Sequence, residues 1–151
     1  MKTIILISCS KGKLTFRAKA EDLYISHLFK ASLQCAKLQS PDEIFILSAK
    51  YELLDLDRVI CPYDETLKSM STAQVKEWAV KVIEQLEEKG VSLNTDCFIF
   101  LAGDKYRKYL TPRMANYEVP MEGKRIGEQL HFLKYHCDDK FRCTSRNSDG
   151  G

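Results

Sequence analysis

Residues Thr3-Ile4-Ile5-Leu6-Ile7-Ser8 are the stretch of sequence from which the fold is predicted. They form an uninterrupted apolar, β-branched run, which is typical of a strand buried on both faces of a sheet. Two runs of the same kind follow, Glu43–Ser48 and Cys97–Leu101. Strands of this kind occur in parallel sheets that carry helices on both sides. The sequence therefore predicts a domain in which strands and helices alternate.

Amphipathic helices are predicted between these strands. Residues 20–38 carry an approximate apolar stripe, and this helix is expected to end before Pro41, because a proline restricts the residue before it. The clearest helix begins after Ser71, which has capping-box spacing with Gln74. We therefore predict an α/β fold with a mainly parallel sheet of about four strands flanked by helices, in a three-layer, Rossmann-like arrangement.

The remaining segments predict a long loop, two short helices and a tail. Residues 49–70 lack clear periodicity, and long loops in compact domains are often functional. Short helices are expected over residues 104–110 and 126–134. We assign residues 1–136 to a single domain and residues 137–151 to a polar, disordered C-terminal tail.

Composition narrows the function and the location. The 151 residues include 23 basic and 21 acidic side chains, for a net charge of +2. This balance argues against a non-specific binder of polyanions. No apolar run is long enough for a membrane span or a signal peptide, so no membrane partner is expected. The six cysteines show no CxxC pair or framework spacing, so we predict reduced thiols in a cytoplasmic protein.

Polar residues follow each of the three buried strands. The segments are Ser8-Cys9-Ser10-Lys11, Ser48-Ala49-Lys50-Tyr51 and Gly103-Asp104-Lys105-Tyr106. Because ligands of open α/β sheets bind at the carboxyl ends of the strands, we expect these segments to converge on one site. Their hydroxyls, thiol, lysines, carboxylate and phenols suit a ligand that carries a phosphate or a purine-like ring.

Each of these side chains also has an ordinary structural interpretation. The loop with Lys11 and Gly12 either binds an anion through its backbone N–H groups or is a solvated turn. Lys50 either meets a ligand or carboxylate or keeps its ammonium in water. Cys9 is either a nucleophile or an inert packing residue. Asp64 acts as a general base, orients a ribose hydroxyl or caps a turn.

The histidines and late cysteines do not predict a metal site. His131, His136, Cys137 and Cys143 lack the spacing of a standard zinc site. We therefore expect no metal and no other cofactor.

Five stretches in order carry a resemblance to a known family. They are residues 7–13, 20–29, 46–67, 101–106 and 123–130. The chain resembles a family of uncharacterised small domains of bacteria, archaea and phages. That family is distantly similar to the YaaA peroxide-stress proteins and to the domain of archaeosine synthase that carries a Cys-Ser-x-x-Lys loop. The resemblance implies an association with nucleic acids or modified nucleobases.

The resemblance also implies ligand-binding residues and one departure from the family pattern. Matched by motif, the residues are Ser8, Cys9, Ser10, Lys11, Ser48, Lys50, Tyr51, Tyr63, Asp64, Gly103 and Tyr106. The departure is Glu52, where the family usually has a glycine that allows a positive φ or a close backbone approach. Glu52 predicts either a shifted loop or an extra carboxylate in the pocket.

Together these features predict an enzyme that recognises a nucleotide or nucleobase, free or within DNA or tRNA. Its chemistry would be glycosidic-bond cleavage or group transfer to the base. Lys11 and the loop amides would hold a phosphate, Tyr51 or Tyr63 would stack on the base, and Asp64 or Asp104 would be the acid/base group. The alternatives are a non-catalytic nucleic-acid-binding stress-response module and a sensor of a small nucleotide ligand. The sequence leaves the oligomeric state open.

Overall fold

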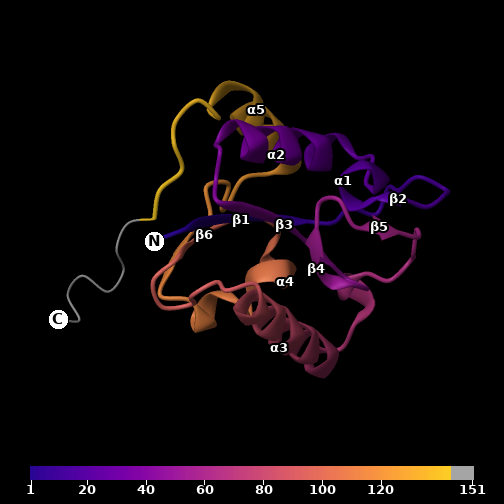
Figure 1. Cartoon of the computed structure of the whole chain (residues 1–151). Coiled ribbons are helices and arrows are strands. Elements are labelled where there is room, and N and C mark those ends of the chain that lie inside the picture. Colours follow the sequence, from indigo (N-terminus) through magenta and orange to yellow (C-terminus); the bar gives the residue numbers. More distant parts are fainter. Residues whose placement is uncertain (144–151) are drawn as a thin grey trace.

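The computed structural model describes residues 1–143 and confirms the predicted α/β fold (Figure 1). Its main sheet has the strand order β4-β3-β1-β6-β7. All neighbours in this sheet run parallel except β4, which is antiparallel to β3. The sheet therefore has five strands where about four were expected. The strands are β1 (Thr3–Ser8), β3 (Glu43–Ser48), β4 (Glu52–Asp55), β6 (Cys97–Leu101) and β7 (Asn116–Glu118).

Helices cover both faces of this sheet, as the three-layer prediction requires. Figure 1 shows α2 and α5 on one face and α3 and α4 on the other. A separate two-stranded sheet joins β2 (Ala18–Lys19) to β5 (Val59–Ile60). The helices are α1 (Ala20–Leu23), α2 (His27–Leu38), α3 (Thr72–Glu88), α4 (Asp104–Arg107) and α5 (Ile126–Tyr135), with short 3-10 turns η1 (Leu67–Ser69) and η2 (Thr111–Arg113).

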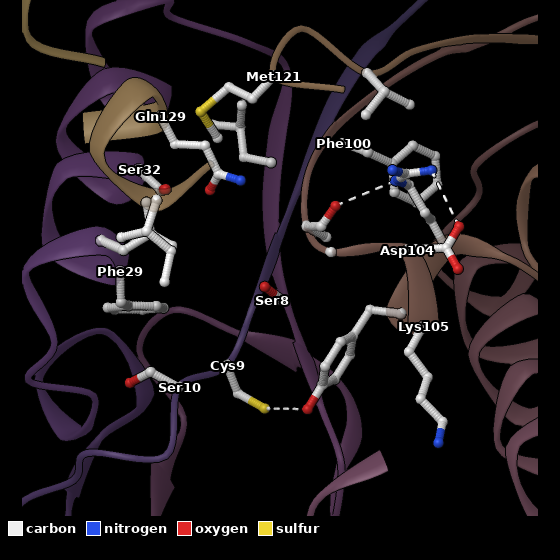
Figure 2. Close-up of a pocket in the computed structure, with 18 of the residues that line it drawn as sticks. Ser8, Cys9, Ser10, Phe29, Ser32, Phe100, Asp104, Lys105, Met121 and Gln129 are labelled. Atoms are coloured by element: carbon white, nitrogen blue, oxygen red, sulfur yellow. Dashed lines mark hydrogen bonds and ion pairs between the residues drawn. The ribbon is translucent and has the colours of Figure 1, made fainter. Parts of the chain in front are cut away.

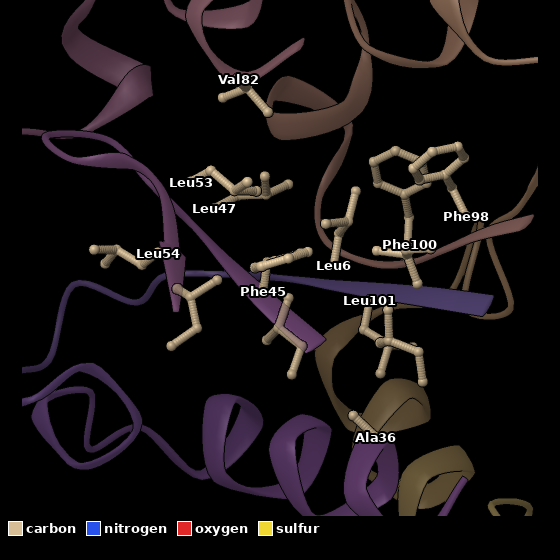
Figure 3. Packing of buried hydrophobic residues seen from close by; sticks show 14 of the residues in the cluster. Leu6, Ala36, Phe45, Leu47, Leu53, Leu54, Val82, Phe98, Phe100 and Leu101 are labelled. Carbon is tan, nitrogen blue, oxygen red and sulfur yellow. The ribbon is translucent and has the colours of Figure 1, made fainter. Parts of the chain in front are cut away.

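The central strands are buried on both faces, which explains their unbroken apolar sequence. Residues 4–7 of β1 are at most 1% exposed. Figure 3 shows Leu6 of β1 among Phe45 and Leu47 of β3 and Phe98 and Phe100 of β6. Burial of each such side chain contributes about 1.5–3 kcal/mol. This core fixes the positions at which the three strands end.

The single helix predicted over residues 20–38 is wrong, because it is broken into α1 and α2. Tyr24 has extended backbone angles, bridges to Lys13 and is fully buried. α2 then starts after Ser26, whose hydroxyl accepts a hydrogen bond from the N–H of Phe29 at 3.1 Å. The break lets the Tyr24 ring enter the core, and the Ser26 cap stabilises the new helix start.

The predicted capping box at the start of α3 is confirmed. The Ser71 N–H donates to Gln74 Oε1 at 2.8 Å, and the Gln74 N–H donates to Ser71 Oγ at 3.2 Å. α3 packs against β4, which lies in the segment predicted as a long loop. In that segment Glu52 has a φ of +58°, the left-handed region that favours glycine.

The Glu52 carboxylate faces α3. Its Oε1 accepts a hydrogen bond from Gln85 Nε2 at 3.2 Å, while Gln85 Oε1 accepts from the N–H of Leu53 at 2.9 Å. Of the two expectations for Glu52, an extra carboxylate in the pocket is therefore wrong. The backbone keeps the conformation that a glycine would adopt.

Two disulfides correct the expectation that all six cysteines are reduced. Cys35 of α2 is bonded to Cys137, and Cys97 of β6 is bonded to Cys143, while Cys9 and Cys61 are free. Neither bond was visible in the sequence, because their partners lie 102 and 46 residues apart. Disulfides are uncommon in reducing compartments, so the predicted cytoplasmic location loses the thiol argument that supported it. No helix within residues 1–143 is long and apolar enough to cross a bilayer.

The first part of the predicted tail, residues 137–143, is held against α2. The Gln39 side-chain amide donates to the carbonyl oxygens of Cys137 at 2.6 Å and Asp139 at 2.9 Å, and its oxygen accepts from the N–H of Phe141 at 2.7 Å. Gln39 itself is buried. The rest of the predicted tail, residues 144–151, lies outside the described residues.

Candidate functional site

The strand order creates a natural ligand site between β1 and β6. The chain passes from β1 through α2 to β3 on one side, whereas β6 lies on the other side of β1 after α3. Ligands of open α/β sheets bind at the carboxyl ends of the strands where the order reverses in this way. A cavity of about 480 Å³ opens there. This volume lies within the range of small-molecule sites.

The cavity is built from the loop after β1, the start of α2, the loop after β6 with α4, and the segment leading into α5 (Figure 2). Ser8, at the end of β1, and Cys9 and Ser10 of the following loop line the cavity. The N–H of Cys9 donates to the carbonyl of Leu47 at 2.9 Å, and Ser10 Oγ donates to the carbonyl of Gly12 at 3.0 Å. These two bonds fix the path of the loop as it leaves the sheet.

Cys9 and Tyr106 meet in the lining of the cavity. The Cys9 sulfur lies 3.2 Å from the Tyr106 hydroxyl. Burial raises the pKa of Tyr106 above its ordinary value, and the neighbouring Cys9 adds to this, so the phenol keeps its proton at neutral pH. The Tyr106 ring packs edge-on against Trp78, with centroids 5.8 Å apart. The structure thus places a free thiol beside a protonated, well-positioned phenol.

Gly103 and Asp104 also line the cavity. The Asp104 side chain is 76% exposed and lies 3.6 Å from the Arg107 guanidinium. Arg107 Nε donates to the carbonyl of Ala102 at 3.3 Å. Arg107 is therefore held beside the carboxylate, and its charge is balanced there.

Ser48 and Tyr63 belong to a buried network outside the lining of this cavity. The Tyr63 hydroxyl lies 2.8 Å from Ser48 Oγ and 2.6 Å from the Tyr24 hydroxyl. Burial raises the pKa of both tyrosines well above the ordinary value. Lys13 Nζ lies 4.4 Å from the centroid of the Tyr63 ring. With its hydroxyl bonded and its ring in the core, Tyr63 is placed to order the strand ends rather than to stack on a ligand.

Four other residues predicted for the site lie outside the cavity lining. Lys11, Lys50 and Asp64 are exposed, and Tyr51 is half-buried. The Lys50 ammonium and the Arg58 guanidinium lie 5.6 Å and 5.2 Å from the Tyr51 ring centroid. Within residues 1–143, the Asp64 carboxylate has no hydrogen-bond or ion-pair partner that would orient it.

The sequence did not predict that α2 and α5 form one wall of the cavity. It also did not predict that lysines of η1 and α4 line the opposite side together. The available signal was a polar residue within an apolar helical stripe: Ser32 follows Phe29 by one turn. The residues missed are Phe29, Ser32, Lys68, Met121 and Gln129, whereas Lys105 lies in one of the three predicted segments but was given no role.

Residues 1–143 contain no group of three or more His, Cys, Asp or Glu side chains arranged to hold a metal ion. Cys137 and Cys143 are each bonded to another cysteine. His131 and His136 lie beside each other, with ring centroids 5.9 Å apart.

Comparison with known proteins identifies the family. No curated protein and no solved structure matches the chain. The sequence model of one family, described as a family of unknown function (DUF6884), matches residues 4–135. The match takes in the main sheet except Thr3 and every residue that lines the cavity, and it stops before Cys137 and Cys143. The protein therefore belongs to the family DUF6884.

Proposed function

We propose that the protein binds a nucleotide or nucleobase in the cavity between β1 and β6 and acts on the base by glycosidic-bond or group-transfer chemistry. The observation that carries the proposal is the composition of this cavity. It combines an apolar wall, two lysines and a thiol–phenol pair at a strand-order reversal. These groups suit a planar ring, a phosphate and a reaction at the glycosidic bond that joins the ring to the sugar.

The apolar wall suits a flat, weakly polar ring. Phe29, Phe100 and Met121 line it from α2, β6 and the segment before α5, and all three are at least nine-tenths buried. Their packing into the core holds them in fixed positions. Contact of a base with an aromatic side chain contributes about 1–3 kcal/mol.

The cationic side suits a phosphate. Lys68 and Lys105 line the cavity, and neither forms an ion pair with an acidic side chain of residues 1–143. Lys105 Nζ donates to the carbonyl of Lys68 at 3.4 Å, which keeps the two lysines together. The phosphate-binding role expected for Lys11 is therefore proposed for these two lysines.

The reactive groups are Cys9, Tyr106 and Asp104. A thiol supplies a nucleophile, and a protonated phenol or a carboxyl group supplies general acid–base catalysis. Asp64, which lies outside the cavity lining, is not included. The resemblance of the loop after β1 to the Cys-Ser-x-x-Lys loop of archaeosine synthase, and of the chain to YaaA proteins, supports a ligand connected with nucleic acids.

A thermal-shift screen tests the proposal. The purified protein is melted with mononucleotides, nucleosides, deazaguanine bases and short oligonucleotides, because a ligand of the native state raises the Tm. We expect a shift with a mononucleotide or base that is lost in Lys105→Ala and kept in Lys81→Ala, an exposed lysine of α3. Chromatography of the bound compound then shows turnover, which Cys9→Ser should reduce.

Three outcomes contradict all or part of the proposal. If none of the compounds shifts the Tm, the cavity does not bind nucleotides. If only oligonucleotides shift it, the shift fades with salt and Lys105→Ala keeps it, the protein is the non-catalytic nucleic-acid-binding module instead. A ligand that binds without turnover in the wild type identifies the sensor.

A further inference from the structure

The cavity has two ends of different chemistry on the two sides of the sheet. Lys68 of η1 and Lys105 of α4 lie at one end, and η1 packs against α4. The other end is formed by α2 and α5, which pack against each other (Figures 1 and 2). The lysine at the α2–α5 end, Lys124, has its ammonium 5.6 Å from the centroid of the Phe132 ring. The α2–α5 end is therefore polar mainly through uncharged side chains.

Ser32 of α2 is the first of these side chains. The residue is 2% exposed and lines the cavity, and its hydroxyl has no hydrogen-bond partner within residues 1–143. No fully enclosed side-chain oxygen in that part of the chain lacks a partner, so the Ser32 oxygen must be open to the cavity. A hydroxyl in such a place costs free energy unless a ligand or water bonds to it.

Gln129 of α5 is the second. Its Nε2 donates to the carbonyl of Lys124 at 2.8 Å, which sets the orientation of the amide. One N–H of the amide and its oxygen are left to bond to a ligand. Figure 2 shows Gln129 and Ser32 on the same side of the cavity, near Phe29 and Met121. The two residues together offer a hydroxyl, an amide donor and an amide acceptor beside an apolar wall.

We propose that Ser32 and Gln129 form the base-recognition end of the cavity, and that the ligand is a nucleoside monophosphate unit whose phosphate lies at Lys68 and Lys105. This inference rests on the proposed function and assigns specificity to two residues. A base edge carries fixed donors and acceptors, which the hydroxyl and the amide can match. The bond between base and sugar then lies near the ends of β1 and β6, close to Cys9.

Calorimetric titration of the full chain tests this division. The probes are AMP, GMP, CMP, UMP, ribose 5-phosphate and a single-stranded oligonucleotide of mixed sequence. We expect the wild type to prefer one mononucleotide over ribose 5-phosphate. Ser32→Ala and Gln129→Leu should each weaken the binding of that mononucleotide about five- to tenfold. The affinity for ribose 5-phosphate should stay unchanged. Lys68→Ala and Lys105→Ala should weaken both.

The controls separate binding from folding and identify the source of the unit. Gln34→Ala, on the exposed side of α2, should change no affinity. Unchanged circular dichroism melting shows that Ser32→Ala and Gln129→Leu are folded. The titration with the oligonucleotide shows whether the protein binds a nucleotide within a strand or a free mononucleotide. Ser32→Ala and Gln129→Leu should weaken the binding of whichever of these two ligands the wild type binds.

The results separate the base-recognition role of Ser32 and Gln129 from the proposed function. Suppose that the wild type binds a mononucleotide, but Ser32→Ala and Gln129→Leu weaken the binding of ribose 5-phosphate as much as that of the mononucleotide, or change neither affinity. The base-recognition role is then wrong and the proposed function stands. If the wild type binds neither mononucleotides nor the oligonucleotide, the proposed function fails and this inference fails with it.

Discussion

The two edges of the main sheet differ in how their polar groups are satisfied. At the amino ends of the strands, polar groups are bonded within the chain. At the carboxyl ends, the cavity is lined by the Ser32 hydroxyl and the Gln129 amide oxygen, which have no partner within residues 1–143, and by two lysines that form no ion pair there. In open α/β sheets the carboxyl edge is the usual location of the ligand.

The amino edge is closed by side chains that bond to backbone N–H groups. Asp96 is 5% exposed, and its two oxygens accept from the N–H groups of Lys2 and Ser92, each at 2.8 Å. Asp42 accepts from the N–H of Thr3 at 2.7 Å. The Cys97–Cys143 bond ties the start of β6 to the C-terminal segment. These contacts fix the strand starts, and the amino edge is therefore expected to determine stability.

The carboxyl edge also contains the buried hydroxyl network of Ser48, Tyr24 and Tyr63, which lies outside the cavity lining. This network is bonded within the chain, whereas side chains of the cavity lining are left to bond to a ligand. The comparison teaches that substitutions at the two edges should have separable effects: stability at the amino edge and binding at the carboxyl edge.

The largest expected effect is the loss of the disulfides. Cys35→Ser and Cys143→Ser should each lower the free energy of unfolding by about 3 kcal/mol, because an open chain gains more entropy on unfolding. In a protein of this size the Tm should fall by on the order of 10 °C for each. Scanning calorimetry measures the fall in Tm. The control is Cys61→Ser, which changes an exposed free cysteine and should leave the Tm unchanged. An unchanged Tm would show that the bonds do not constrain the chain.

The next effect concerns Asp96. Asp96→Ala leaves two N–H groups without their acceptor and should cost about 2–3 kcal/mol. Urea denaturation measures the loss, and Asp57→Ala, at an exposed carboxylate, is the control. Ligand-binding affinity should be unchanged in the folded fraction. A loss of affinity would mean that the two edges are coupled.

High pH should destabilise the fold through its buried tyrosines. Burial raises the pKa of Tyr24, Tyr63 and Tyr106, so above about pH 10 the unfolded chain releases protons that the folded chain keeps. Stability is therefore full below pH 10 and falls as the pH rises toward the raised folded values. Each tyrosine contributes up to about 1.4 kcal/mol per pH unit. Tyr24→Phe should reduce the slope of stability against pH, whereas Tyr135→Phe, at an exposed tyrosine, should not.

A smaller effect, of opposite sign, is expected at Glu52. Its φ of +58° is unfavourable for a residue with a Cβ, and glycine relieves that cost. Glu52→Gly loses the hydrogen bond from Gln85 and gains entropy in the unfolded state, so the net gain should be at most about 1 kcal/mol. Thermal unfolding measures it. A lower Tm would show that the contact with α3 outweighs the backbone strain.

The smallest effect on stability is expected at the carboxyl edge. Lys105→Ala removes an exposed side chain and should change the free energy of unfolding by less than about 0.5 kcal/mol. The same variant should lose the ligand-induced rise in Tm. If it is instead as destabilised as Asp96→Ala, the carboxyl edge contributes to stability as well.

The sequence predicts the sheet and α3 well because their signals are local. The apolar run of β1 and the capping box at Ser71 depend on neighbouring residues. The break at Tyr24 was missed because it depends on the core that receives the ring, which a helical stripe does not reveal. Glu52 was expected to shift the loop or to add a carboxylate to the pocket, but its backbone keeps a glycine-like φ of +58° and its side chain is directed by Gln85 of α3, which the sequence pattern does not reveal.

The candidate site divides in the same way. The loops after β1 and β6 could be assigned to it, because strand ends follow directly from strand positions. Tyr63 and Asp64 were expected in the site. Tyr63 instead belongs to a buried hydroxyl network, and Asp64 is exposed at the surface outside the cavity lining. Ser32 and Gln129 lie on helices far apart in the sequence and have uncharged side chains, so only the packing of α2 against α5 brings them to one cavity.

The two disulfides have a consequence for a chain that is cut. The bonded pairs are Cys35–Cys137 and Cys97–Cys143, so the two covalent loops overlap in sequence between residues 97 and 137. A protease that cleaves a single peptide bond anywhere between residues 35 and 143 leaves two pieces that at least one bridge still joins. The nicked protein should migrate as one band without reductant and as two bands with it.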